Sequence, residues 1–265
     1  MRAREHQATL MNSVPFATLP LRPELLASIA TLAYESMTAV QAQTLPHLLN
    51  GQDMIAQAKT GSGKTAAFAI GLLNKLDAQS YCTQTLVLCP TRELAEQVAA
   101  EVRRLASAIP NIKLLTLCGG KPMGPQLVSL QRDPHIVVGT PGRILKHLEK
   151  ETLHLNVLQT LVLDEADRML DMGFHDDIMQ IIGKAPASRQ TLLFSATYPA
   201  GIKEISSIVQ RDPVDIRVEA SHNSTDIDQV FFQVGKSERV QTLFKVITHY
   251  QPESTLVFCN TKQQC

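Results

Sequence analysis

Residues 58–65 have the sequence Ala58-Lys59-Thr60-Gly61-Ser62-Gly63-Lys64-Thr65 and carry the strongest structural signal in this chain. They follow an apolar run at 53–58 and precede a segment with helical periodicity, so we expect them to join a strand to a helix. Gly61 and Gly63 permit positive φ angles and let backbone N–H groups approach an anion closely. Free N–H groups at the N-terminus of the following helix provide further donors for an anion. The segment therefore predicts a phosphate-binding loop, although Ala58 stands where the usual pattern has glycine. A plain glycine-rich turn is the alternative.

An apolar strand that ends in carboxylates is the expected partner of such a loop, and Leu161-Val162-Leu163-Asp164-Glu165 supplies it. Lys64 has the length to reach the β- and γ-phosphates of a nucleotide, and Thr65 has a hydroxyl for Mg²⁺. Asp164 is predicted to hold the same ion through water. Glu165 is predicted to orient and deprotonate the attacking water. An acidic first turn of a helix is the alternative for Asp164 and Glu165.

The rest of the chain alternates short apolar runs with amphipathic segments, which predicts an α/β fold with a mostly parallel sheet flanked by helices. The strand candidates are 53–58, 85–89, 112–118, 135–139, 160–164, 191–195 and 213–218. Helices are expected after Lys64, around residues 94–105, and after Thr140, where Pro141 fits the first helical turn.

After Val218 the sequence becomes polar and loses its periodicity, which suggests that a second unit follows. Residues 1–13 are interpreted as an N-terminal extension, 14–218 as the first domain and 219–228 as a polar linker. Residues 229–265 are predicted to start another α/β domain, with strands at 229–234 and 255–259 around a helix. One such β-α-β unit cannot bury both faces of its sheet, so we expect it to pack on the first domain or to be the front part of something longer.

Composition narrows the functional classes. The 25 Lys and Arg residues balance the 25 Asp and Glu residues, which excludes a globally basic nucleic-acid coat and leaves only a local polyanion site. Trp is absent, which argues against broad aromatic stacking platforms. The five cysteines form no C-x-x-C pair and are expected to be reduced, mostly buried thiols of a cytoplasmic protein. No apolar run is long enough for a membrane span, and no apolar core follows the charged N-terminus, so we expect neither membrane insertion nor a signal peptide.

Eight motifs stand in the order typical of the DEAD-box RNA helicases, which the chain resembles over about residues 14–265. They are Gln41, the phosphate loop, Pro90-Thr91-Arg92-Glu93-Leu94, Gly119-Gly120, Thr140-Pro141-Gly142-Arg143, Asp164-Glu165-Ala166-Asp167, Ser195-Ala196-Thr197 and Val257-Phe258-Cys259-Asn260. The resemblance implies a RecA-like domain that binds ATP, Mg²⁺ and RNA. It also implies RNA-dependent ATP hydrolysis coupled to RNA duplex unwinding.

The resemblance assigns roles around the nucleotide. Gln41 would recognise adenine and Phe16 would stack on it, although Ala33 and Ala39 depart from the family pattern nearby. Without the resemblance, Gln41 fits a solvated helix residue and Phe16 a core residue. The remaining nucleotide contacts would come from Ala58, Lys59, Thr60, Gly61, Ser62, Gly63, Lys64 and Thr65.

RNA contacts and coupling residues also come from the resemblance. The positions that hold RNA in the family are Arg92, Gly119, Gly120, Thr140 and Arg143. Contacts to phosphates alone imply sequence-independent binding. Thr91 and Thr140 also fit plain helix N-caps, and Gly119-Gly120 fits a turn. Ser195 and Thr197 would couple the nucleotide to RNA, through hydrogen bonds with Asp167.

Members of this family use a second RecA-like lobe that supplies an arginine finger, worth about 10³–10⁵ in turnover. No later Arg-rich motif follows Asn260 here, so we expect this polypeptide to bind ATP weakly, to hydrolyse it slowly and not to unwind RNA alone. A non-catalytic nucleotide- or RNA-binding module that acts through a partner is the alternative, and a P-loop ATPase acting on DNA is a third interpretation. Ribosomal RNA is a candidate target.

Overall fold

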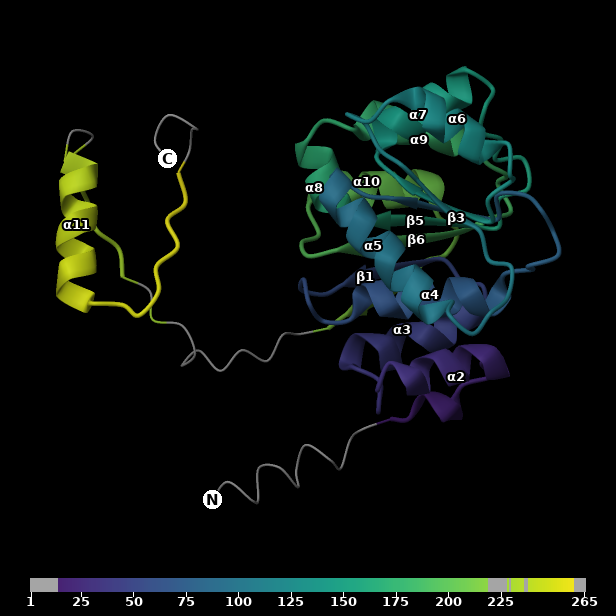
Figure 1. Ribbon diagram of the computed structural model, residues 1–265, viewed down its shortest axis with the longest axis horizontal. Coiled ribbons are helices and arrows are strands. Elements are labelled where there is room, and N and C mark those ends of the chain that lie inside the picture. The colour runs from purple at the N-terminus through teal and green to yellow at the C-terminus, as the bar shows by residue number, and fades with distance from the viewer. Residues whose placement is uncertain (1–13, 219–227, 229, 236–237, 260–265) are drawn as a thin grey trace. The chain divides into compact units, whose positions relative to one another are not determined.

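The computed structural model describes residues 14–218, 228, 230–235 and 238–259 (Figure 1). Chain contacts divide the molecule into two units, residues 1–220 and 221–265. The predicted extension 1–13 and nearly all of the predicted linker 219–228 lie outside the described residues. Each unit is described by itself below.

The first unit is built on a seven-stranded parallel sheet with the strand order β3-β4-β2-β5-β6-β1-β7. The strands are β1 (Met54–Gln57), β2 (Thr85–Leu88), β3 (Leu114–Leu117), β4 (Ile136–Gly139), β5 (Thr160–Asp164), β6 (Gln190–Ser195) and β7 (Val214–Arg217). Each strand lies within one or two residues of a predicted one. The predicted α/β fold with a parallel sheet is therefore confirmed.

Helices cover both faces of this sheet, which explains why its strands are apolar almost throughout. In Figure 1, α2, α3 and α4 lie on one side of the sheet and α7, α9 and α10 on the other. The helices of this unit are α2 (Pro23–Thr31), α3 (Ala39–Leu49), α4 (Lys64–Lys75), α5 (Arg92–Leu105), α6 (Met123–Leu130), α7 (Pro141–Glu149), α8 (Ala166–Asp171), α9 (His175–Gly183) and α10 (Ala200–Val209), preceded by the short 3₁₀ helix η1 (Phe16–Thr18).

Successive strand residues point to opposite faces and form two separate cores. On β5, Val162 belongs to the core with α3, α4 and α5, whereas Leu161 and Leu163 belong to the core with α7, α9 and α10. Phe194 of β6 joins the first core, where its ring lies 5.3 Å from that of Phe68 on α4. These two cores fix the sheet rigidly between its helices.

Because all strands are parallel, their carboxyl ends meet at one edge of the sheet, where open α/β sheets bind ligands. The register places Gln57 beside Ser195 and Asp164 beside Phe194. The loop after β1, the Asp-Glu pair of β5 and the Ser-Ala-Thr segment after β6 therefore share this edge. The segments after β2, β3 and β4, which carry the motifs assigned to RNA, extend the same edge toward β3.

The second unit differs from its prediction. Its described residues contain one helix, α11 (Arg239–Tyr250), and no strand at 230–234 or 255–259. Apolar side chains there stay exposed, with Phe231 at 88% and Phe258 at 89%. Isolated strands gain little without neighbours that pair with them and cover their faces, which accounts for their absence.

Two further predictions concern cysteines and membranes. Cys89 and Cys118 are buried, as expected from their apolar strands, whereas Cys82 and Cys259 are half-buried. Cys265 lies outside the described residues. None of the helices in the described ranges is long and apolar enough to cross a bilayer.

Candidate functional site

The loop between β1 and α4 has the geometry expected of a phosphate cradle. Gly61 and Gly63 have φ angles of +80° and +97°, which residues with a side chain rarely adopt. Ser62 closes the loop by donating from its hydroxyl to the Lys59 carbonyl at 2.7 Å. Helix α4 begins at Lys64, so its free N–H groups face the same space.

Lys64 and Gln41 tie this loop to its surroundings. The Lys64 ammonium is buried and donates to the Ala58 carbonyl at 2.6 Å, across the mouth of the loop. Gln41 Nε2 donates to the Gly63 carbonyl at 3.3 Å, and Gln41 Oε1 accepts from the Thr38 N–H at 2.8 Å. A Cβ at position 63 would lie 2.7 Å from Gln41 Nε2, so glycine is required here for space as well as for φ.

Part of the hydrogen-bonding capacity of the Gln41 side chain is therefore used within the protein. It forms a capping box with Thr38 at the start of α3. A glutamine amide offers two N–H donors and two acceptor lone pairs, so one donor and one lone pair stay available. That pair matches what adenine presents at its N6 and N7 atoms. Gln41 lines the pocket described below, and its recognition of adenine stays a prediction.

The acidic pair at the end of β5 lies across from the loop. Asp164 is 3% exposed, and burial raises the pKa of its carboxyl to about 6, although the nearby Lys64 acts in the opposite direction. Glu165 has a φ of +53°, an unusual value for a residue with a side chain. Its carboxylate is paired with Arg168 at 3.2 Å. Backbone strain of this kind often occurs at functional sites.

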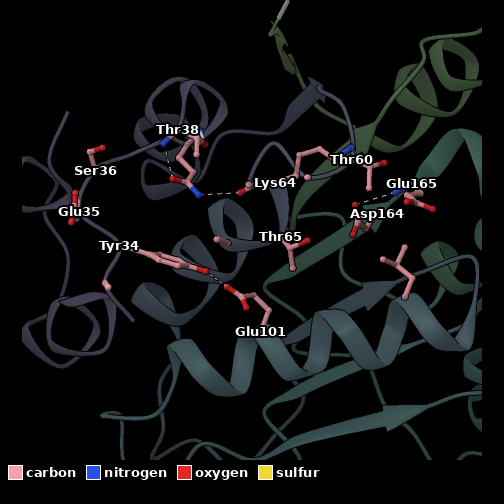
Figure 2. Close-up of a pocket in the computed structure, with 16 residues that line it drawn as sticks. Tyr34, Glu35, Ser36, Thr38, Thr60, Lys64, Thr65, Glu101, Asp164 and Glu165 are labelled. Carbon is pink, nitrogen blue, oxygen red and sulfur yellow. Dashed lines mark hydrogen bonds between the residues drawn. The ribbon is translucent and has the colours of Figure 1, made fainter. Parts of the chain in front are cut away.

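A cavity of about 570 Å³ joins the loop and the acidic pair (Figure 2). Its wall includes Thr60, Gly61, Gly63, Lys64 and Thr65 from the loop, Asp164 and Glu165 from β5 and its end, and Gln41 from α3. Ala58, Lys59 and Ser62 do not line it, and they shape the loop instead. The residues predicted to hold a triphosphate and its metal ion are thus brought together.

The donor atoms fit Mg²⁺. Thr65 offers a hydroxyl and Asp164 a buried carboxylate whose raised pKa shows that a nearby cation would stabilise its charged form. Across the described residues, no group of three or more His, Cys, Asp or Glu side chains could hold a metal by itself. One carboxylate, one hydroxyl and the oxygens of a phosphate and water form the set that Mg²⁺ usually takes.

Phe16 is placed differently from the expectation that it faces the base. It is 3% exposed, belongs to the core and does not line the cavity. Tyr34 lines the cavity instead. Its ring is stacked on that of Phe16, with 6.4 Å between the ring centroids. The Tyr34 hydroxyl donates to Glu101 on α5, and burial together with this carboxylate raises the pKa of Tyr34 to about 12. Tyr34 was not singled out from the sequence, although an aromatic residue seven positions before Gln41 was a usable signal.

Asp167 links the acidic strand end to the segment after β6, as predicted. Its carboxylate accepts from the Thr197 N–H at 2.9 Å and from the Thr197 hydroxyl at 2.7 Å. Its backbone N–H donates to the Ser195 hydroxyl at 3.3 Å. Burial acts to raise the pKa of Asp167, but these hydrogen bonds outweigh it and hold the pKa below its usual value.

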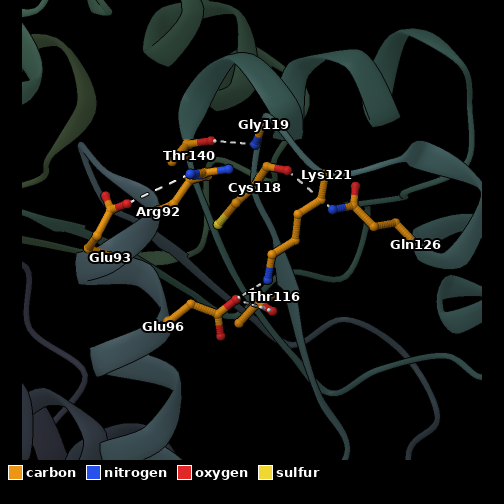
Figure 3. Close-up of polar contacts among 9 residues, drawn as sticks. All are labelled: Arg92, Glu93, Glu96, Thr116, Cys118, Gly119, Lys121, Gln126 and Thr140. Atoms are coloured by element: carbon orange, nitrogen blue, oxygen red, sulfur yellow. Dashed lines mark hydrogen bonds and ion pairs between the residues drawn. The ribbon is translucent and has the colours of Figure 1, made fainter.

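The five residues assigned to RNA lie close together farther along the same edge, and Figure 3 shows three of them, Arg92, Gly119 and Thr140. Gly120 has a φ of +72°, and a Cβ there would lie 2.5 Å from Arg92 Nη1, so the guanidinium lies directly against the glycine turn. The Gly119 N–H donates to the Thr140 hydroxyl at 3.4 Å. Arg143 Nη2 donates to the Lys121 carbonyl at 2.9 Å.

The two threonines that also fit N-caps behave differently. Thr91 caps α5, since its hydroxyl accepts from the Leu94 N–H at 3.2 Å. Thr140 makes no side-chain cap at the start of α7 and bonds to Gly119 instead. Arg92 and Arg143 are both partly exposed at this surface. Two guanidiniums, a glycine turn and a hydroxyl form a surface suited to phosphate groups.

Comparison with known families agrees with this geometry. Residues 38–205 match the model of the family described as DEAD/DEAH box helicase. The chain is 55% identical over 251 residues to the ATP-dependent RNA helicase DbpA of Escherichia coli K12, which covers 94% of this chain and 55% of the relative. It is 40% identical over 253 residues to the DEAD-box ATP-dependent RNA helicase CshA of Bacillus subtilis 168, covering 95% of this chain and 51% of that protein. The chain thus spans about half the length of these relatives.

Solved structures show the same likeness. A crystal structure of a DEAD box protein from Methanococcus jannaschii is similar with a TM-score of 0.74 and 37% sequence identity, over 94% of this chain and 67% of that one. A structure of Dbp5 from Saccharomyces cerevisiae is similar with a TM-score of 0.69 and 29% identity, over 75% of this chain and 52% of that one.

Proposed function

The chain belongs to the DEAD/DEAH box helicase family, and from this premise we propose that it supplies the ATP-binding domain of an ATP-dependent RNA helicase. The observation that carries the proposal is the shared cavity of Lys64, Thr65, Asp164 and Glu165 at the carboxyl edge of the sheet. The whole protein would couple ATP hydrolysis to the separation of RNA strands, in the cytoplasm.

The nucleotide would lie along this cavity with its phosphates in the glycine loop. The N–H groups at the start of α4 and the Lys64 ammonium would neutralise the β- and γ-phosphates. Tyr34 would provide an aromatic wall for the base, and Gln41 would bond to it with its remaining donor and lone pair.

Glu165 would accept a proton from the attacking water. Glu165 lines the cavity next to Asp164, and its carboxylate is paired with Arg168. Thr65 and Asp164 would hold Mg²⁺, which would neutralise charge on the phosphates when bound.

Asp167 would pass the nucleotide state to the RNA side. It follows Asp164 and Glu165 on the chain and is bonded to both ends of the Ser195–Thr197 segment. A change in the position of the acidic pair would therefore move this segment as well. Arg92, Gly119, Gly120, Thr140 and Arg143 would contact RNA phosphates without regard to sequence, and ribosomal RNA is one candidate substrate.

Slow turnover by the 265-residue polypeptide is also part of the proposal. Among the residues that the structure describes, those that line the cavity include no arginine, and the arginine finger of such enzymes is worth about 10³–10⁵ in rate. The second candidate function, a nucleotide- and RNA-binding module that acts through a partner, is favoured by the same observation.

RNA-stimulated ATP turnover and RNA binding by this polypeptide test the proposal. We expect binding of MgATP and of single-stranded RNA, with turnover well below about 1 s⁻¹, the low end for ordinary enzymes. A rate near that value would contradict the expected slow turnover. Competition of single-stranded RNA against DNA of the same sequence tests the substrate, and a tenfold preference for DNA would overturn the assignment to RNA.

A further inference from the structure

Gln126 on α6 lies at the centre of a buried hydrogen-bond network behind the candidate RNA surface. It is 6% exposed, although it is a polar residue on a short surface helix. Its Nε2 donates to the Cys118 carbonyl at 3.2 Å. Its Oε1 accepts from Arg143 Nη1 at 2.7 Å and lies 3.0 Å from His147 Nε2. One side chain thus joins the turn after β3 to helix α7.

The chemistry of these contacts fixes the orientation of each group. The Cys118 carbonyl can only accept, so it must face the amide nitrogen of Gln126. Gln126 Oε1 can only accept, so His147 must carry a hydrogen on Nε2. Burial lowers the pKa of His147, which is 0% exposed, and the neighbouring Arg143 lowers it further. His147 Nδ1 lies 2.9 Å from Thr152 Oγ1, whose hydroxyl also donates to the His147 carbonyl at 3.1 Å.

Arg143 and His147 reach the same oxygen because they are four residues apart on α7 and so share one face of the helix. Arg143 uses its other nitrogen to donate to the Lys121 carbonyl. The Gly119–Gly120 turn is therefore held on one side through Cys118 by Gln126 and on the other through Lys121 by Arg143. The glycine turn and Arg143, both assigned to RNA, are thus in contact with one glutamine, the turn through Cys118.

We infer that Gln126, supported by His147, is a positioning residue that sets the direction of the Arg143 guanidinium and the shape of the Gly119–Gly120 turn for contact with RNA phosphate. The inference rests on the proposed function. An exposed arginine side chain loses conformational freedom when it grips a phosphate, so holding it beforehand strengthens binding. A buried, fully bonded network is the usual way in which proteins impose such rigidity.

Gln126→Met tests the inference, because methionine has nearly the same volume and removes the three hydrogen bonds. The measurement is the affinity of the full chain for a short fluorescein-labelled oligouridine in MgATP, by fluorescence anisotropy, between about 50 and 200 mM salt. We expect the affinity to fall several-fold and the slope of log affinity against log salt to become shallower by up to about 0.7, the share of one phosphate contact on a single strand. Gln131→Met, the same change at an exposed residue next to α6, is the matched control and should alter neither quantity.

A double-mutant cycle with Arg143→Ala separates positioning from general structural damage. If Gln126 acts through Arg143, Gln126→Met should cost less once Arg143 is alanine than it does in the wild type, because only its hold on the turn through Cys118 is then lost. Losses that add in the double variant would overturn the inference. If Arg143→Ala itself leaves RNA binding unchanged, the RNA surface of the proposed function is wrong, and the positioning role toward RNA falls with it. If Arg143→Ala weakens binding but Gln126→Met does not, only the positioning role is wrong.

His147 gives a second test with a built-in rescue. His147→Leu removes the N–H that supports Gln126 Oε1, whereas His147→Gln keeps an amide N–H at a similar reach. We expect His147→Leu to weaken RNA binding and His147→Gln to restore most of it. Hydrogen exchange of residues 118–121 should rise in His147→Leu and in Gln126→Met, while MgATP affinity stays unchanged. Equal RNA affinity for both His147 variants would contradict the inference.

Discussion

The glycine loop after β1 and the glycine turn after β3 lie on the same edge of the sheet but are held by different means. The loop is closed by its own backbone and by Lys64, which is six residues away from the carbonyl that it binds. The turn is closed by Arg92, Gln126 and Arg143, which come from three separate helices. A local motif therefore builds the candidate phosphate loop, whereas long-range packing builds the surface proposed to contact RNA.

The largest effect is expected on ATP hydrolysis at the candidate nucleotide site, where nucleotide binding and the chemical step can be measured separately. Glu165→Gln keeps the shape of the side chain but removes its ability to accept a proton. ATP hydrolysis should fall by about 10²–10⁴, while MgATP affinity stays within a factor of two to three of wild type. Single-turnover hydrolysis and nucleotide titration measure the two quantities. Undiminished hydrolysis would mean that Glu165 has another task.

Lys64→Ala tests whether MgATP binding by the loop depends on the ammonium group of Lys64. Removing a charge-assisted contact to the phosphates should weaken MgATP binding by about ten- to a hundredfold. Lys59→Ala, at an exposed position of the same loop, is the control and should have little effect. Fluorescent nucleotide binding gives both constants. Equal losses of MgATP affinity in the two variants would show that binding depends on positive charge near the loop in general, and that the position of Lys64 has no special role.

Gly120→Ala and Gly119→Ala form a matched pair at the turn. A methyl group on Gly120 would meet Arg92 Nη1 at 2.5 Å at a φ of +72°, whereas one on Gly119 would meet no atom within 4 Å. Gly120→Ala should destabilise the protein by about 1–2 kcal/mol and weaken RNA binding, because Arg92 must move. Gly119→Ala should change the stability little, because its methyl group meets no protein atom. Chemical denaturation and RNA titration check this, and similar results for the pair would refute the role of Arg92 in holding the turn.

The smallest effect concerns the contact between Tyr34 and Glu101. Tyr34→Phe keeps the aromatic wall and loses one hydrogen bond, so the free energy of unfolding should fall by about 1 kcal/mol with little change in ATP affinity. Tyr34→Ala should in addition weaken ATP binding, because the wall is lost. Retained ATP affinity in Tyr34→Ala would show that the base does not rest on this ring.

Local signals predicted the sheet and the conformation of the glycine loop after β1 well, because strand periodicity and glycine spacing act within a few residues. The strands at 229–234 and 255–259 were predicted from the same kind of signal, but the described residues 230–234 and 255–259 form no strand, since a strand also needs partners that its own residues do not encode. Phe16 shows the same limit, because its distance from Gln41 gave no information on whether its ring faces the cavity or the core. Gln126 could not be predicted, since its contacts come from α7 and from the turn after β3.

Gln41 joins the beginning of α3 to the last glycine of the phosphate loop. Any purine that engages its amide would add a third partner to a side chain that already restrains two backbone segments. Binding of the base should therefore add to the thermal stability of the protein. ATP should raise the melting temperature more than inorganic triphosphate does, because only ATP has a base that can bond to Gln41 and strengthen the link between α3 and the loop.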